Sequence, residues 1–241
     1  MNGGKVCVSI CDRTSDGLFE KIEASSKWAD LIEIRFDCLD PEEIARVIDR
    51  VETPQRPHSG SLLATFRPQE QGGQRHLTNE DRRNFWSQGR ERSYWGGDFE
   101  EDLIEESAHS RWSNRIVSHH DFSGSSPNVE LIFKRLSSTP ATHIKIAIQA
   151  KSITDAIPLW NLLQTANAAG KHLIPVAMGE AGKWTRILGL AHGAFLTFAS
   201  PTAGAETAPG QISAVDMTNV FRVKQLDRQT EVFGIVAGDS T

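Results

Sequence analysis

The chain has 241 residues, of which 39% are hydrophobic and 24% charged, and its formal net charge at pH 7 is −5. This composition is typical of a globular protein with a full core, and the acidic balance argues against a nucleic-acid or anionic-membrane surface. No apolar run approaches the roughly 20 residues of a membrane span, and the N-terminus lacks the apolar core of a signal peptide. The three cysteines, Cys7, Cys11 and Cys38, are odd in number and form no CxxC pair. We therefore predict reduced thiols and a cytoplasmic location.

Strand and helix patterns alternate regularly along the chain. Apolar alternation predicts strands over residues 5–11, 30–37, 60–66, 97–102, 115–119, 142–149, 173–177 and 194–198. Helices are predicted over residues 16–28, 41–51, 79–88, 105–110, 127–137, 154–169, 184–192 and 213–223. Asp40 is expected to cap the second helix with Pro41 as its first residue, and Gly170 to end the sixth. Such alternation requires parallel strands joined by right-handed crossovers, and eight repeats predict a single (β/α)8 barrel.

The alternation also assigns side chains to the barrel interior. In strand 142–149, Ile144, Ile146 and Ile148 face the helices, so Lys145 faces inward. The same rule places further side chains inside, most of them ionisable: Ser9, Glu33, Arg35, Arg67, Ser118, His120 and Phe198. Taken alone, Lys145 also fits a surface position on an edge strand. Buried charges without a function are costly and barrel cores are normally apolar, so we predict a site in which a desolvated Lys145 amine attacks a carbonyl.

His120 follows a predicted strand, at the carboxyl-terminal rim where barrel active sites lie. We predict that it acts as a general acid and base. The alternatives are a turn capped by Asp121, a solvated histidine pair with His119, and a zinc site, although zinc needs three or four ligands and no further His or Cys falls at an obvious rim position. His119 should face the opposite side and be structural.

Several charged residues near the same rim have two interpretations each. Glu33 and Arg35 share a strand face and could form an ion pair within the barrel or bind ligand hydroxyls. Arg67 with the Gly72-Gly73 pair could bind a phosphate. Arg186 could grip a carboxylate or lie on a helix surface.

The order and spacing of these segments resemble the type I 3-dehydroquinate dehydratases of the shikimate pathway. The likeness runs over about residues 5–223, in blocks at residues 33–37, 65–67 with 72–73, 118–122, 144–147, 178–186 and 208–211. It implies a (β/α)8 hydro-lyase that works without metal or organic cofactor, is often a homodimer, and converts 3-dehydroquinate to 3-dehydroshikimate for aromatic amino acid biosynthesis. No nucleic-acid or membrane partner is expected.

The resemblance also implies a role for each matched residue. Lys145 would form a Schiff base with the C3 ketone, and His120 would take the C2 proton and help the C1 hydroxyl to leave as water. Arg186 and Gln211 would bind the substrate carboxylate. Glu33, Arg35 and Arg67 would orient ring hydroxyls and balance charge. The other expected pocket residues are Ser9, Gln71, Phe122, Met178, Phe198, Thr207 and Ala208.

Two positions depart from the family pattern. Many members have a glutamate just before the glycine pair, where it contacts the catalytic histidine, and here Gln71 stands there. A glutamine can hold the imidazole through a hydrogen bond, but it supplies no charge and would raise the histidine pKa less. Thr207 replaces a serine and keeps its hydroxyl. The loops bearing Gln71 and residues 205–211 are candidate lids over the substrate.

Residues 1–223 are thus predicted to form the dehydratase domain. Residues 224–241 resemble the linker and first strand that open a shikimate dehydrogenase domain in fused proteins, which predicts the first half, or a remnant, of a bifunctional enzyme. This tail should be flexible or packed on the barrel. Two rivals keep the fold but change the function: an aldolase-like barrel that also uses a lysine Schiff base, and a catalytically silent barrel that acts as a binding or scaffolding subunit.

Overall fold

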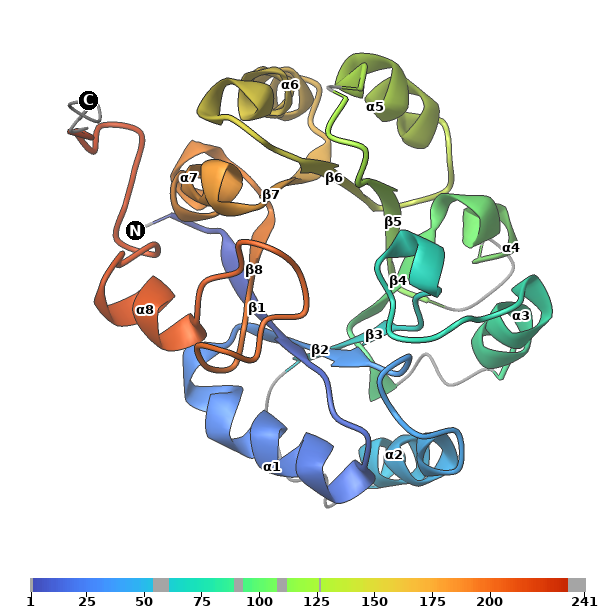
Figure 1. The fold of residues 1–241 in the computed structure, drawn as a ribbon. Helices are drawn as coiled ribbons and strands as arrows, with labels where there is room; N and C mark the ends of the chain where they lie inside the picture. The colour runs from blue at the N-terminus through green and yellow to red at the C-terminus, as the bar shows by residue number, and fades with distance from the viewer. Residues whose placement is uncertain (1, 54–60, 89–92, 108–111, 126, 234–241) are drawn as a thin grey trace, which may run out of the picture.

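The computed structural model describes residues 2–53, 61–88, 93–107, 112–125 and 127–233. In it, eight strands form one parallel sheet in the order β7-β6-β5-β4-β3-β2-β1-β8. Figure 1 views this sheet along the barrel axis, with the helices around it. A hydrogen bond of 3.0 Å from the Phe195 amide to the Leu173 carbonyl joins the start of β8 to β7 and closes the barrel. The strands are β1 (Lys5–Ile10), β2 (Leu31–Arg35), β3 (Ser61–Thr65), β4 (Gly96–Glu100), β5 (Asn114–Asp121), β6 (His143–Gln149), β7 (His172–Met178) and β8 (Leu196–Ala199). The predicted fold class is confirmed.

The helices follow their strands as predicted, several with a short 3-10 turn. They are α1 (Ser15–Ser25), α2 (Glu43–Glu52), α3 (Asn79–Trp86), α4 (Ile104–Ser107), α5 (Val129–Ser137), α6 (Ile157–Ala168), α7 (Lys183–Leu188) and α8 (Ala214–Asn219). The 3-10 turns include η1 (Ser26–Trp28), η2 (Gln69–Gln71), η4 (Glu101–Leu103), η5 (Ile153–Ala156), η6 (Glu180–Gly182) and η7 (Leu190–His192). Gly170 ends the sixth helix region with a φ of 65°, as expected of a left-handed C-terminal glycine.

The predicted start of α2 is wrong. The helix begins at Glu43, not Pro41, and Asp40 does not cap it. The Asp40 amide bonds the Arg13 carbonyl at 2.9 Å, and its carboxylate pairs with the Arg13 side chain at 3.1 Å. The Asp40 carboxylate, which would cap the helix, thus pairs with Arg13 in the loop after β1. Asp40 therefore links two loops at the barrel mouth.

Two apolar layers hold the barrel together. Outward-facing strand residues such as Ile144 and Ile146 share one buried cluster with helix residues such as Leu159 and Leu163, as the alternation predicted. A second cluster lies on the inner face of the strands: Cys7, Leu31, Leu63, Ile116, Ala147, Ile174, Val176, Met178, Leu196 and Phe198. Part of this inner layer also reaches the carboxyl-terminal ends of the strands, where Ala147, Val176, Met178 and Phe198 line a pocket.

Packed aromatic and imidazole side chains close the amino-terminal end of the barrel. His143, at the start of β6, lies 4.1 Å from Phe195, 5.1 Å from His172 and 5.2 Å from Trp95 between ring centroids. Its side chain is buried among these aromatics, and burial with the nearby His172 lowers the pKa of His143 to about 4. The end opposite the mouth is therefore sealed.

The prediction of three reduced thiols is wrong for two of them. Cys11 and Cys38 form a disulfide with their Cα atoms 5.4 Å apart, and Cys7 stays a buried free thiol. The two cysteines follow β1 and β2, which pair in register with Ser9 opposite Glu33. Residues just beyond the ends of adjacent parallel strands come within the distance that a disulfide requires.

In the described ranges, no helix is both long enough and apolar enough to cross a membrane. The described part of the tail is tied to the start of the chain: Asn2 Nδ2 donates to the Val223 and Leu226 carbonyls at 2.8 Å, and Lys224 Nζ donates to the Gly4 carbonyl at 2.8 Å. The predicted dehydrogenase-like strand falls in part on residues 234–241, which lie outside the described residues.

Candidate active site

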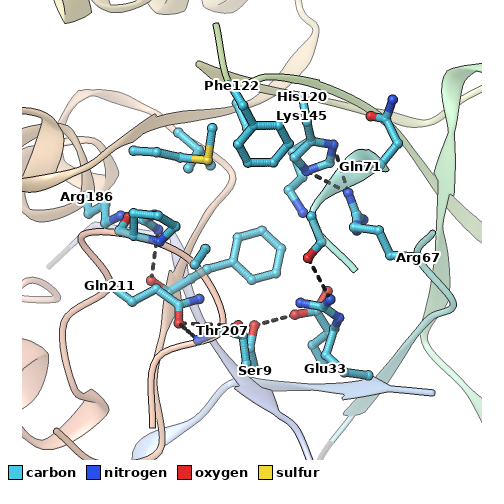
Figure 2. Close-up of a pocket in the computed structure, with 18 residues that line it drawn as sticks. Ser9, Glu33, Arg67, Gln71, His120, Phe122, Lys145, Arg186, Thr207 and Gln211 are labelled. Atoms are coloured by element: carbon cyan, nitrogen blue, oxygen red, sulfur yellow. Dashed lines mark hydrogen bonds between the residues drawn. The ribbon is translucent and has the colours of Figure 1, made fainter. Parts of the chain in front are cut away.

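A pocket lies at the carboxyl-terminal ends of the strands. Figure 2 shows Arg186 and Gln211 on one side of it, with His120 and Arg67 on the opposite side. The structure brings every site residue named from the sequence to this one pocket: Ser9, Glu33, Arg35, Arg67, Gln71, His120, Phe122, Lys145, Met178, Arg186, Phe198, Thr207, Ala208 and Gln211. Convergence of so many polar groups on one concave surface is typical of a small-molecule site.

Lys145 lies on β6 in the floor of the pocket and is 7% exposed. Its Nζ donates to Asp98 Oδ2 at 2.9 Å and lies 4.3 Å from the centre of the Phe198 ring. Burial lowers the pKa of Lys145, and Arg67 adds to that effect while Asp98 opposes it. An amine in this setting loses its proton more readily than an exposed lysine, so it can act as a nucleophile.

His120 is near the end of β5, beside Ala147 of β6. Arg67 Nη1 lies 2.6 Å from its Nε2 and 2.9 Å from its Nδ1. A guanidinium has only donors, so this contact needs an unprotonated ring nitrogen. Burial, and then the charges of Arg67 and Lys145, lower the pKa of His120 well below its usual value. The imidazole is therefore neutral and able to accept a proton.

The interaction expected between Gln71 and His120 is absent: among the described residues, the imidazole takes its hydrogen bonds from Arg67. Gln71 lines the pocket at the end of η2. His119 faces away, as predicted, and its Nδ1 lies 3.1 Å from Glu101 Oε2. Within the described ranges, no group of three His, Cys, Asp or Glu side chains could hold a metal ion.

Glu33 and Arg35 do not pair with each other. Glu33 accepts hydrogen bonds from Ser9 Oγ and, at 2.7 Å, from Thr65 Oγ1. Arg35 makes a two-bond contact with Asp37, from Nε at 2.9 Å and Nη2 at 2.7 Å. Burial disfavours the Arg35 charge, yet Asp37 outweighs it and raises the pKa of Arg35. Both side chains are thus fixed in place with polar surface toward the pocket.

The glycine pair after Arg67 serves the turn rather than an anion. Gly72 has a φ of 84°, and a Cβ there would lie 2.8 Å from the Phe122 ring. A Cβ at Gly73 would lie 1.9 Å from the Arg67 carbonyl oxygen. The amides of Gln71, Gly72 and Gly73 bond carbonyls of the same turn, which leaves none of the three for a phosphate.

Arg186 is the one pocket cation that lacks a carboxylate partner in the described part of the chain. It lies on α7, is 2% exposed, and makes only long bonds to the Phe198 and Pro209 carbonyls, at 3.4 and 3.3 Å. Its Nε has no hydrogen-bond partner, and burial lowers the pKa of Arg186 to about 10. Gln211 lines the same side, with its Oε1 accepting from the Thr207 amide at 2.7 Å. A buried, unpaired guanidinium provides a site for an anionic group.

Sequence reasoning missed two buried carboxylates of β4. Asp98 accepts from Ser118 Oγ and pairs with Lys145 and, at 2.7 Å, with Arg67 Nη2. Burial opposes its ionisation, but Arg67 and Lys145 outweigh burial and lower the pKa of Asp98. Burial raises the pKa of Glu100 to about 7, although Arg67 opposes the change. Alternation within the Gly-Gly-Asp-Phe-Glu stretch was the available signal, because it places Asp98 and Glu100 on one strand face.

Known proteins share this fold and sequence pattern. The model of the type I 3-dehydroquinase family matches residues 6–228. A 3-dehydroquinate dehydratase of Desulfotalea psychrophila is 29% identical over 92% of this chain and 98% of its own length. A chloroplastic bifunctional 3-dehydroquinate dehydratase/shikimate dehydrogenase of Arabidopsis thaliana is 27% identical over 98% of this chain and 40% of its own length. The crystal structure of 3-dehydroquinate dehydratase from Geobacillus kaustophilus superposes with a TM-score of 0.79 at 25% identity, covering 92% of this chain and 91% of that one.

Proposed function

The chain belongs to the type I 3-dehydroquinase family, and from that premise we propose how its own residues carry out the reaction. It is a hydro-lyase that removes water from 3-dehydroquinate in the shikimate pathway. One observation supports the mechanism most: a buried amine of lowered pKa, a neutral imidazole and an unpaired guanidinium face the same pocket.

In the first step, the neutral amine of Lys145 attacks the C3 ketone of the substrate. A carbinolamine forms, and loss of water from it gives an iminium between Nζ and C3. Asp98, 2.9 Å from Nζ, holds the amine at the pocket floor and stabilises the positive charge of the iminium.

In the second step, His120 takes the C2 proton. The electron pair of the broken C–H bond moves toward the iminium nitrogen, which gives an enamine. The protonated His120 then donates its proton to the C1 hydroxyl, which leaves as water while the C1–C2 double bond forms. Hydrolysis of the resulting iminium frees 3-dehydroshikimate and Lys145.

The low pKa of His120 fits the order of these events. In the free pocket, burial and the charge of Arg67 disfavour a charged imidazole whether or not Lys145 is protonated, so the base is available at neutral pH. Burial and the positive charge of Arg67 also make the imidazolium a strong acid once it has formed. This favours transfer of its proton to the departing hydroxyl.

Arg186 and Gln211 are proposed to bind the substrate carboxylate. The guanidinium is buried without a counter-ion, and a carboxylate would satisfy its unbonded Nε. Glu33 and Arg35 lie along another part of the wall and are proposed, with Arg67, to orient the ring hydroxyls. A phosphosugar aldolase would bind a phosphate, for which a glycine-rich loop with unbonded amides is expected. Among the described residues, Arg186 has no such loop beside it, which favours a carboxylate as its ligand.

Reductive trapping tests the covalent step. The protein is incubated with 3-dehydroquinate and borohydride, and the modified peptide is located by mass spectrometry. We expect one adduct, on Lys145, and its loss in Lys145→Met. Lys151→Met is the matched control, because Lys151 is exposed and Lys145 is buried. Turnover without an adduct would contradict the Schiff-base mechanism, and neither turnover nor an adduct would favour the silent barrel.

Further proposals follow from family membership and from the tail. We propose that the chain forms a homodimer and acts in the cytoplasm, which light scattering and fractionation test. We also propose that residues 224–241 open a shikimate dehydrogenase segment, which the downstream reading frame tests.

A further inference from the structure

The Cys11–Cys38 disulfide lies at the pocket mouth and has no part in the proposed chemistry. Cys11 is the first residue after β1, and Cys38 is the third after β2. The bond thus joins the loop that leaves β1 to the loop that leaves β2. Both strands supply residues to the pocket wall, including Ser9 two positions before Cys11 and Arg35 three positions before Cys38.

On the Cys38 side, residues 36–39 are hydrogen-bonded to the loop that is formed by residues 68–75. Asp37 Oδ2 accepts from the Gln74 amide at 3.0 Å, and the Leu39 carbonyl accepts from Arg75 Nη1 at 2.5 Å. Arg35 Nη2, which Asp37 orients, donates to the Gly72 carbonyl at 3.2 Å. The position of the Gln71-Gly72 wall therefore depends on residues 36–39.

On the Cys11 side, the other ties between the two loops are weaker. The Asp40 amide bonds the Arg13 carbonyl at 2.9 Å. The Arg13 side chain of the Arg13–Asp40 ion pair is 81% exposed, and ion pairs as exposed as this contribute little to stability. Farther along, the Ser15 amide bonds Glu43 Oε2 at 2.9 Å. The disulfide is the covalent tie at the point where both loops leave the barrel.

We propose that the Cys11–Cys38 disulfide positions the substrate-binding wall, so that substrate affinity depends on the oxidation state of the bond. A dithiol is the reductant that would break it. One thiolate of the dithiol attacks a disulfide sulfur, Cys11 being partly exposed, and its second thiolate then displaces the remaining cysteine. Two electrons and two protons pass to Cys11 and Cys38, and the dithiol becomes a cyclic disulfide. The effect on catalysis rests on the proposed function.

Thiol titration in denaturant gives the first test. We expect one thiol per chain in untreated protein, from Cys7, and three after dithiothreitol treatment and desalting without oxygen. Three thiols in the untreated protein, when it is purified without reductant, would overturn the proposal.

Kinetics on the two forms test positioning. Reduction should raise KM for 3-dehydroquinate by roughly 3- to 10-fold, the cost of reordering one or two side chains, and leave kcat within about twofold. Cys11→Ser/Cys38→Ser should match the reduced form and lose its response to dithiothreitol. Cys7→Ala is the control, since it keeps the bond and should still respond. An unchanged KM, or a fall in kcat alone, would overturn positioning.

Hydrogen–deuterium exchange provides a test that does not need turnover. Amides of residues 36–39 and 68–75 should exchange faster after reduction, while those of β6 should not change. Equal exchange in both forms would overturn the proposal even if the enzyme turns over. No turnover in either form would count against the proposed function alone, and the exchange result would still decide whether the bond positions the wall.

Discussion

Replacing Arg186 by methionine should raise the stability of the free protein and weaken its binding of substrate. Burial lowers the pKa of its guanidinium from 12.5 to about 10. One pKa unit corresponds to about 1.4 kcal/mol, so the empty pocket destabilises this charge by roughly 3 kcal/mol. Arg186→Met removes that cost, together with two long hydrogen bonds to the Phe198 and Pro209 carbonyls, worth roughly 1 kcal/mol each. The free variant should therefore be about 1 kcal/mol more stable than wild type, a rise in Tm of roughly 2–4 °C.

The same substitution should damage function. A carboxylate entering the variant pocket loses its charged partner, which typically costs 2–5 kcal/mol. We expect kcat/KM to fall by about 10²- to 10³-fold, and added 3-dehydroshikimate to raise the Tm of wild type but not of Arg186→Met.

Arg35→Met is the matched control. Arg35 is also a buried pocket arginine, but it is paired with Asp37, so its removal leaves a buried carboxylate without its partner. Its expected effect is a destabilisation of about 3–5 kcal/mol. Differential scanning fluorimetry and steady-state kinetics measure both variants. Equal destabilisation of the two proteins, or unchanged substrate affinity in Arg186→Met, would refute the assignment of Arg186 as an unpaired carboxylate receptor.

Three further predictions concern His143, the disulfide and Gln71. The pKa of His143 is about 4 when folded and 6.5 when free, so the folded state binds fewer protons between these values. The free energy of unfolding should fall as pH drops from 6.5 toward 4, and in urea melts of His143→Phe this fall should be smaller by at most roughly 3 kcal/mol, the remainder coming from groups such as His120. Loss of the disulfide, whose cysteines are 27 residues apart, should cost ~3.5 kcal/mol by the chain-entropy relation; a melting shift under about 2 °C would contradict that estimate. Gln71→Glu adds a carboxylate to the pocket and should raise the pKa of His120, moving the acidic limb of kcat/KM to higher pH; an unmoved limb would show that the two side chains do not interact.

Most of the site could be predicted because it depends on strand alternation. Once Ile144 and Ile146 are assigned to the helix side, Lys145 must face the interior, and the same rule places Glu33 and His120. The eight-fold repeat then brings these strand ends together. The family resemblance supplied the residues of the loops, such as Gln211, for which no periodicity exists.

The parts that could not be predicted depend on contacts between segments distant in sequence. Alternation placed Glu33 and Arg35 on one face, but it could not show that Arg35 would pair with Asp37 instead. The disulfide was missed because a cysteine count does not show that two strand ends meet at a suitable distance. Asp98 was missed because Phe99 is the only apolar side chain in the predicted fourth strand, so no apolar alternation assigned the faces of that strand.

Asp98 changes how the charge of the whole site should be understood. Without it, Lys145, Arg67 and Arg35 would place three buried cations around one pocket floor, and their mutual repulsion would add to the cost of burial. Asp98 pairs with Lys145 and Arg67 at once, and Asp37 pairs with Arg35, so these three cations are compensated before any ligand arrives. Arg186 is not compensated. Arg186 is therefore the one pocket cation left without a carboxylate partner in the described structure, and it lies across the pocket from His120 (Figure 2). If the substrate carboxylate binds Arg186, as proposed above, the rest of the ring is presented to the amine and the imidazole.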